Sequence, residues 1–401
     1  MMRLVSTIAV ALALAGCATR SDPPIAAGPV LDAANADRIR AAGGTILFWN
    51  QEQRDANFPA MERLFPGHVV KARGPVRALP AGAPLTVPAS EIDAFIQSMN
   101  VAGIIVLDRG KVRLERYARG HSAAGRWTSF SVAKSFTSTL VGAAIKDGHI
   151  ASIADPVTRY IPELGGSAYD GVTVHQLLTM TSGVRWNENY TDPNSDVVRM
   201  YAKPVPDGID PTVAYLRTLP REAAPGTKWV YKTGETNLIG VLVAKATGRP
   251  MANYMSDKIA GPAGFERDGF WMVDQSRQEI GGCCLSLALR DYARMGQFAL
   301  DGGRGQVPAN WFADALGEQA SVGRPGYGYG YQWWVYPHGS GGQGIFGQSL
   351  YIDRANDIVI VTSSAWPKAT GAELWAKLRA FDDRIVDAIV AERSQPSTRS
   401  K

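Results

Sequence analysis

The sequence has little cysteine and little histidine, and this limits the chemistry that it can carry. Three cysteines and five histidines occur in 401 residues. None of them is spaced as Cys-x-x-Cys, His-x-x-x-His or His-Glu-x-x-His, the patterns by which short segments hold a metal ion. Cys283 and Cys284 are adjacent, which suits an ordinary disulfide poorly. We therefore expect no metal, no cofactor and no disulfide that staples the fold.

Runs of one charge are also absent. The net charge is +5, but the 42 lysines and arginines are spread along the chain and form no basic segment. Nucleic-acid-binding domains concentrate such residues on one face or in one run, so we expect no nucleic-acid partner. With 45% hydrophobic residues and no repeat of fixed period, the chain is typical of a globular protein with a large core.

The amino-terminal residues differ from the rest. Residues 1–3 are Met-Met-Arg and residues 4–15 are apolar, which is the pattern of a signal peptide and too short to cross a membrane comfortably. Residues 14–17, Leu-Ala-Gly-Cys, resemble the bacterial lipobox, whose cysteine is lipidated and becomes the first residue of the mature protein. The resemblance implies a signal peptide at 1–16, a lipid anchor on Cys17 and, with Ala18 in place of Asp, the periplasmic face of an outer membrane. The alternative is a plain signal peptide with an incidental cysteine.

The remaining chain predicts a tether at 17–44, a folded domain at 45–394 and a short tail at 395–401. Residues 102–117 predict a hairpin, and 131–145 and 236–247 predict helices, the second ended by Gly248 and Pro250. Strand patterns return at 329–336, 345–353 and 357–363, before a closing helix at 372–391. This order indicates an α+β fold, in which an antiparallel sheet is assembled from both ends, flanked by helices and joined to a mostly helical subdomain.

Ser131 and Lys134 form the one Ser-x-x-Lys of the sequence, at the start of an apolar helical run. The spacing places both side chains on one helix face, and a helix N-terminus offers unpaired backbone N–H groups beside the serine. To accept a proton, Lys134 needs its pKa lowered from about 10.4 towards neutrality, which burial can achieve. The motif alone is weak, because two fixed residues recur by chance about once in such a chain. No serine is flanked as Gly-x-Ser-x-Gly, the nucleophile elbow that carries the serine of many Ser-His-Asp triads. The sequence therefore does not indicate such a triad.

Longer segments give the motif its context. Residues 127–136, 155–164, 172–183 and 229–237 occur in the order and spacing of a known group. They resemble the class C β-lactamases, DD-peptidases and carboxylesterases, which share the β-lactamase/transpeptidase-like fold. More narrowly, residues 131–135, 162–171, 187–193 and 344–348 are similar to the 6-aminohexanoate-dimer hydrolases, the nylon-oligomer amidases of this fold. The resemblance covers about residues 95–390.

This resemblance implies a serine hydrolase with three catalytic side chains. Ser131 is the nucleophile, Lys134 and Tyr231 share its proton, and Tyr231 then protonates the leaving group. The N–H groups of Ser131 and Ile345 form the oxyanion hole.

The resemblance also implies residues that contact the substrate. Tyr190 corresponds to the tyrosine that hydrogen-bonds the scissile amide in the nylon-oligomer enzymes. Trp186 and Trp334 are candidates for the walls of the acyl pocket.

Two departures from the wider group move the prediction away from β-lactams. Thr233 stands where Asn or Ser usually follows the catalytic tyrosine, and no Lys-Thr-Gly or His-Thr-Gly occurs near the Gly-rich segment after His338. We therefore predict hydrolysis of a small-molecule amide or ester through an acyl-enzyme on Ser131. A DD-peptidase or weak β-lactamase, and a non-catalytic penicillin-binding-like sensor module, remain as alternatives.

Overall fold

The computed structural model describes residues 45–201 and 210–394. The predicted signal peptide, Cys17, the tether and the carboxyl-terminal tail lie outside the described residues. Among the helices that it describes, none is long and apolar enough to span a membrane.

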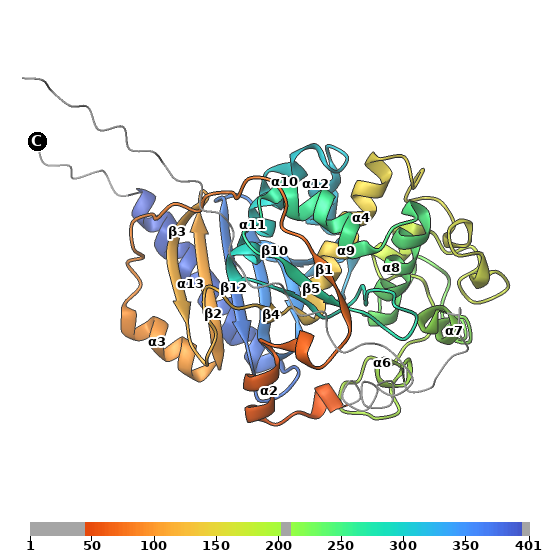
Figure 1. Cartoon of the computed structure of the whole chain (residues 1–401), viewed down its shortest axis with the longest axis horizontal. Helices are drawn as coiled ribbons and strands as arrows, with labels where there is room; N and C mark the ends of the chain where they lie inside the picture. Colours follow the sequence, from red (N-terminus) through yellow and green to blue (C-terminus); the bar gives the residue numbers. More distant parts are fainter. Residues whose placement is uncertain (1–44, 202–209, 395–401) are drawn as a thin grey trace, which may run out of the picture.

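A large antiparallel sheet forms one side of the molecule, and a group of helices forms the other (Figure 1). The sheet has eight strands in the order β3-β2-β12-β11-β10-β9-β8-β7. Strands from the two ends of the domain meet where β2 pairs with β12, which confirms the predicted assembly. The strands are β2 (Val101–Asp108), β3 (Lys111–Tyr117), β7 (Ala320–Ser321), β8 (Gly328–Tyr329), β9 (Trp334–Tyr336), β10 (Gly339–Gly344), β11 (Gln348–Asp353) and β12 (Ile358–Ser364).

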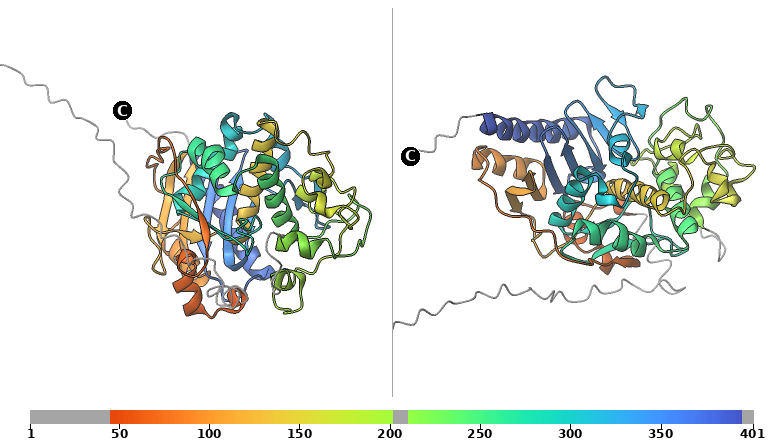
Figure 2. Two further views of the ribbon diagram at one scale, coloured as in Figure 1. Left: turned by 45° about the vertical axis from the view of Figure 1, so that its right-hand side comes forward. Right: turned by 90° about the horizontal axis from the view of Figure 1, so that it is seen from above.

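Helices cover both faces of this sheet, and the period-two alternation of β2 shows how. Ile104 and Val106 pack in the cluster with α3 (Ala89–Ser98) and α13 (Ala372–Ser394). Ile105 and Leu107 point the other way, into the cluster with α4 (Ala133–Lys146) and α11 (Leu289–Leu300). Figure 2 shows these layers from above. Because both faces are buried, β2 is an almost continuous apolar run.

The predicted helices form with small shifts at their ends. The α4 helix begins at Ala133, after a 3₁₀ turn at Phe130–Val132 that contains Ser131. The α8 helix (Thr233–Thr247) begins three residues before the predicted start and ends at Gly248, whose φ of 66° is the left-handed conformation that glycine favours. The other helices are α2 (Gln51–Asn57), α5 (Val174–Leu178), α6 (Asp196–Arg199), α7 (Pro211–Leu216), α9 (Met251–Met255), α10 (Gly261–Ala263) and α12 (Trp311–Ala315).

The Gly-rich segment after His338 is a strand, although the sequence predicted only a lead into one. β10 lies between β9 and β11 in the large sheet, and the next strand starts at Gln348, not at Ile345. Glycine has low β-propensity, so the strand pattern was invisible. Its glycines allow a close approach: a Cβ on Gly342 would lie 3.1 Å from the Ser135 Oγ. The backbone of β10 therefore packs closely against the start of α4.

A second, four-stranded sheet was not predicted, because its strands have only two to four residues. It consists of β1 (Gly67–Val70), β5 (Gly269–Met272), β6 (Leu285–Leu287) and β4 (Trp127–Thr128), in that order. β4 leads directly into the turn that holds Ser131, so this small sheet helps to place the serine.

The adjacent cysteines, whose role the sequence left open, are bonded to each other. Cys283 and Cys284, just before β6, form a disulfide with each other. The bond joins neighbouring residues, so it restricts one turn and does not connect distant segments of the chain.

Candidate active site

Ser131 lies in the 3₁₀ turn between β4 and α4, with 9% of its surface exposed. The turn is held by Phe130, whose φ of 42° is costly for a bulky residue. The Phe130 ring is buried, with its centroid 5.0 Å from that of Phe58 and 5.4 Å from that of Phe346. This aromatic packing fixes the serine at the amino end of α4.

Lys134, on the first turn of α4, is buried beside the serine. Its Nζ lies 3.1 Å from the Ser131 Oγ, 3.1 Å from the Thr233 Oγ1 and 2.8 Å from the carbonyl oxygen of Gly282. All three contacts are neutral oxygens, and no carboxylate pairs with Lys134 in the part of the chain that the structure describes. Burial therefore lowers the pKa of Lys134 to about 7, with the charge of Glu188 opposing the shift. A substantial fraction of neutral amine is available at pH 7 to take the proton of Ser131.

Tyr231 approaches the same serine from the segment before α8. Its phenol lies beside the Ser131 hydroxyl, and the Lys134 Nζ lies 5.2 Å from the centroid of its ring. The ring stacks on Trp334 at a centroid distance of 5.7 Å. Burial raises the pKa of Tyr231 far above its usual value, so the phenol keeps its proton at neutral pH. It is therefore set up to donate a proton, while Lys134 is set up to accept one.

Ile345 directly follows β10, in a 3₁₀ turn next to the serine. Both residues line the same cavity. A Cβ on the preceding Gly344 would lie 3.0 Å from the backbone nitrogen of Ser131, so the two backbone segments almost touch. The backbone of Ile345 is thus close enough to that of Ser131 to face a common oxyanion.

Glu188 is a residue of this site that the sequence analysis missed. Its carboxylate accepts hydrogen bonds from the Thr233 backbone N–H (3.0 Å) and hydroxyl, the Tyr190 hydroxyl (2.8 Å) and the Trp186 indole N–H. Thr233 therefore links Glu188 to Lys134, which gives a role to the threonine that departs from the usual Asn. Glu188 lies in the segment 187–193 that carried the family resemblance, but no spacing distinguished it there.

A cavity of about 680 Å³ opens onto Ser131. Of the predicted substrate residues, Tyr190 and Trp334 line it, whereas Trp186 is buried beneath Glu188 and is not among the lining residues. The other lining residues come from several elements: Glu188, Tyr231, Arg324, Tyr327, Gln343, Gly344, Ile345, Thr370, Ala372, Glu373, Trp375, Ala376 and Arg379.

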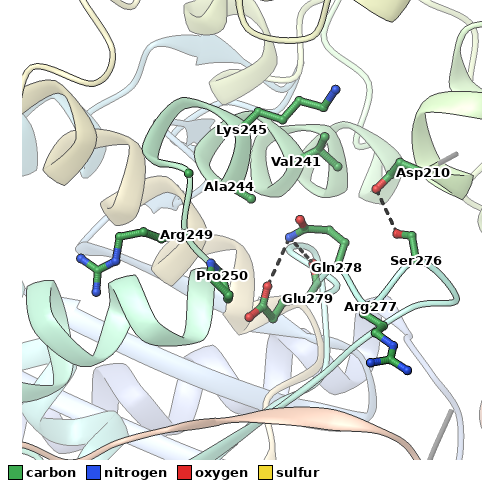
Figure 3. Close-up of a pocket in the computed structure, with 11 residues that line it drawn as sticks. Asp210, Val241, Ala244, Lys245, Arg249, Pro250, Ser276, Arg277, Gln278 and Glu279 are labelled. Carbon is green, nitrogen blue, oxygen red and sulfur yellow. Dashed lines mark hydrogen bonds between the residues drawn. The ribbon is translucent and has the colours of Figure 1, made fainter. Parts of the chain in front are cut away.

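A smaller pocket of about 290 Å³ lies at the far end of α8 (Figure 3). The Ser276 hydroxyl donates to Asp210 across it, and the Gln278 amide donates to the carboxylate of Glu279. None of the catalytic side chains lines this pocket, so the cavity at Ser131 is the candidate site.

The site geometry is that of a serine hydrolase in which a lysine and a tyrosine serve the nucleophile. The chain belongs to the Beta-lactamase family, whose model matches residues 90–382. It is similar to the 6-aminohexanoate-dimer hydrolase of Paenarthrobacter ureafaciens, with 32% identity over 356 residues that cover 82% of this chain and 90% of that protein. Esterase EstB of Burkholderia gladioli is 31% identical over 159 residues, 37% of this chain and 39% of the esterase.

Solved structures agree on the fold. A Bacillus anthracis protein, provisionally described as a 6-aminohexanoate-dimer hydrolase, superposes with a TM-score of 0.72 at 22% identity, covering 85% of this chain and 95% of that one. A penicillin-binding protein from Bacillus halodurans gives a TM-score of 0.60 at 13% identity, covering 73% and 99%. These similarities confirm the predicted β-lactamase/transpeptidase-like fold.

Proposed function

We propose that this hydrolase cleaves a linear amide or ester through an acyl-enzyme on Ser131. The observation that carries the proposal is the buried Lys134, with a pKa of about 7, whose Nζ lies 3.1 Å from the serine Oγ and, among the described residues, bonds neutral oxygens alone. The similarity to a 6-aminohexanoate-dimer hydrolase over most of both chains supports an amide as substrate, and the shorter similarity to an esterase supports an ester.

Each step of the proposed reaction uses a group of this site. The Ser131 Oγ attacks the carbonyl carbon and passes its proton to Lys134, while the N–H groups of Ser131 and Ile345 face the developing oxyanion. Tyr231 then protonates the departing nitrogen or oxygen, which leaves the acyl group on Ser131. Water attacks this ester, with the same groups moving the proton in reverse, and frees the serine.

The test is labelling of the serine together with a panel of substrates. We expect a fluorophosphonate to modify Ser131, and S131A to lose at least about 10³-fold of the activity on p-nitrophenyl esters and linear amides. S138A is a matched control, because Ser138 is a buried serine of α4 whose hydroxyl donates to the Ser135 carbonyl, its one side-chain partner in the described part of the chain. Full activity of S131A would overturn the proposal. Turnover of nitrocefin, or lasting acylation by penicillin, would favour the β-lactamase, DD-peptidase or sensor alternative.

We also propose that Cys17 carries a lipid and tethers the enzyme on the periplasmic side of an outer membrane. The support is the sequence of residues 1–18 alone. We expect wild-type protein in the membrane fraction and C17A in the soluble fraction, at equal specific activity. Equal distribution of both proteins would contradict the anchor.

A further inference from the structure

The direction of the lone pair on Lys134 depends on which neighbouring oxygens take its two N–H groups. A neutral primary amine has two N–H groups and one lone pair, and among the described residues Nζ has hydrogen-bonding oxygens on Ser131, Thr233 and Gly282. A carbonyl oxygen can only accept, so Gly282 takes one N–H. The Thr233 hydroxyl gives its own proton to Glu188, so it takes the other. The lone pair is then left facing the Ser131 hydroxyl, as proton transfer requires.

The Gly282 carbonyl keeps its place through contacts of the preceding peptide, because glycine has little conformational preference of its own. Both polar groups of the peptide that joins Gly281 to Gly282 are hydrogen-bonded to side chains. The Thr137 hydroxyl of α4 donates to the Gly281 carbonyl at 2.7 Å, and the Gly282 N–H donates to the Asn237 Oδ1 of α8 at 2.8 Å. Since the C=O and N–H of a trans peptide point in opposite directions, the two helices hold this peptide from opposite sides.

Asn237 is buried, with 2% of its surface exposed, and a second partner fixes the orientation of its amide. Its Nδ2 donates to the Tyr201 hydroxyl at 2.7 Å, which leaves Oδ1 for the Gly282 N–H. The fit around Gly282 is tight, since a Cβ there would lie 2.9 Å from the Asn237 Oδ1 and 3.0 Å from the Thr233 carbonyl oxygen. Asn237 does not line the cavity at Ser131, so any effect on the reaction passes through Gly282.

We propose that Asn237 is a positioning residue for the catalytic lysine. With Thr137 it holds the peptide before Gly282, so that the Gly282 carbonyl binds one N–H of Lys134 and the lone pair faces Ser131. The inference rests on the proposed function and adds to it the residues that orient the base. When the O–H bond of Ser131 breaks, its proton forms a third N–H bond on Lys134, and the electron pair left on Oγ attacks the substrate. The ammonium then donates to the same three oxygens, so no neighbouring group has to move.

Removal of the Asn237 amide should lower kcat and shift the pH profile. N237L keeps a similar volume, but the Gly282 N–H loses its acceptor and the carbonyl loses its fixed direction. We expect kcat on a p-nitrophenyl ester to fall about 10-fold or more at unchanged KM. The rise of kcat/KM with pH should move to lower pH, because the charged form of Lys134 loses an acceptor while Glu188 is unchanged. A wild-type pH profile in N237L, or a kcat within about twofold of wild type, would overturn the inference.

A conservative variant at the same position separates positioning from folding. N237D keeps an oxygen that accepts from the Gly282 N–H, and its other oxygen can accept from the Tyr201 hydroxyl. We expect N237D to recover most of the kcat that N237L loses. Rates are referred to active sites counted with a fluorophosphonate, so that unfolded protein does not enter the comparison. An equal loss of kcat in N237D and N237L would overturn the inference.

The other side of the peptide offers a matched pair of variants on one helix. T137V removes the hydroxyl that holds the Gly281 carbonyl and keeps the shape of the side chain. T139V is the control, because Thr139 is buried on the same helix and donates to the Ser135 carbonyl of that helix at 2.7 Å. We expect kcat to fall several-fold in T137V alone, and N237L/T137V to lose little more than N237L, since both side chains act on one peptide. Equal kcat in T137V and T139V, or fully additive losses, would overturn the inference.

A crystal structure of N237L separates this inference from the proposed function. If Ser131 is not labelled and no substrate is hydrolysed, the proposed function fails, but the backbone of the variant still reports on Asn237. A Gly282 carbonyl that has turned away from Lys134 in N237L supports the positioning role. A carbonyl that stays 2.8 Å from Nζ, as in the wild type, overturns it.

Discussion

Two clusters near the start of α8 contain the same four residue types and differ in their pairing. The catalytic cluster is Ser131, Lys134, Tyr231 and Glu188. The closed cluster is Ser182, Lys232, Tyr169 and Glu235. In the closed cluster, the Lys232 Nζ lies 3.6 Å from the Glu235 carboxylate, which also accepts from the Ser182 hydroxyl and, at 3.4 Å, from the Tyr169 hydroxyl.

The comparison shows that the partner of the lysine decides whether a serine, a lysine and a tyrosine become reactive. They become reactive when no carboxylate pairs directly with the lysine. In the closed cluster the Glu235 carboxylate pairs with the lysine and accepts hydrogen bonds from both hydroxyls. None of the four residues lines the cavity at Ser131. In the catalytic cluster Thr233 stands between Glu188 and Lys134, so that the hydrogen bonds of the lysine to described residues all go to neutral oxygens. Separation of lysine from carboxylate is what leaves the amine basic but unprotonated near pH 7.

Removing the catalytic lysine should have the largest effect. K134M deletes the group that accepts the proton of Ser131, and we expect kcat/KM to fall by about 10³-fold. The melting temperature should change little, because methionine fills a similar volume and no carboxylate loses a partner. The check is esterase activity together with a thermal melt. Retention of a tenth of the activity would contradict the assignment of Lys134 as the base.

The matching change in the closed cluster should affect stability and leave catalysis intact. K232M leaves Glu235 buried without its cation, and we expect a loss of about 3–5 kcal/mol in the free energy of unfolding. Burial already raises the pKa of Glu235, so the loss should be smaller at low pH, where this carboxyl is protonated. Urea unfolding at two pH values measures this. The double variant K232M/E235Q should recover part of the stability, and a large drop in kcat would show that the clusters are coupled.

Neutralising Glu188 should shift the pH dependence. The activity of the wild type should rise with pH as Lys134 loses its proton near pH 7, and the charge of Glu188 raises that pKa. In E188Q the rise should therefore move to lower pH, and kcat should fall about 10-fold because the contacts to Thr233 and Tyr190 weaken. E222Q, at an exposed carboxylate, is the control for the profile of kcat/KM against pH. If the profile of kcat/KM against pH is the same in E188Q as in the wild type, Glu188 has only a structural role.

Removing the Tyr190 hydroxyl should have the smallest effect of the four. Y190F loses one hydrogen bond to Glu188, and we expect about a 5-fold loss on an amide and less on the matching ester, if the hydroxyl also contacts the scissile amide. Y215F, which removes a hydroxyl bonded to Asp196 outside the site, is the control. Equal losses on amide and ester would mean that Tyr190 acts through Glu188 alone.

The fold, and the meeting of Ser131, Lys134 and Tyr231 in one site, could be predicted because their signals are local. The apolar strands β2 and β12 and the helix after Ser131 have clear periods, and Ser131, Lys134 and Tyr231 lie in recognisable segments. The sequence does not reveal Glu188 in the same way, since its importance depends on contacts with Thr233, 45 residues away in the chain. β10 was missed because packing of its backbone, not side-chain pattern, makes it a strand.

Trp186 shows a second limit. Aromatic residues near a motif can line a cavity or fill the space beneath it, and the sequence cannot separate these outcomes. Trp186 fills the space beneath the cavity, where its indole N–H donates to Glu188. Trp334 lines the cavity and stacks on Tyr231.

The disulfide between Cys283 and Cys284 predicts that reduced and oxidised preparations of this enzyme differ in activity. The preceding peptide carries the Gly282 carbonyl that accepts from Lys134 at 2.8 Å, and the Cys283 carbonyl is held by the indole of Trp271 at 3.1 Å. A ring closed between neighbours removes little entropy from the unfolded chain, so its effect is local and not global. Material made in a reducing cytoplasm and material from an oxidising compartment should therefore melt alike and differ in turnover. Each rate constant measured for this protein should therefore be reported with a thiol titration of the same preparation.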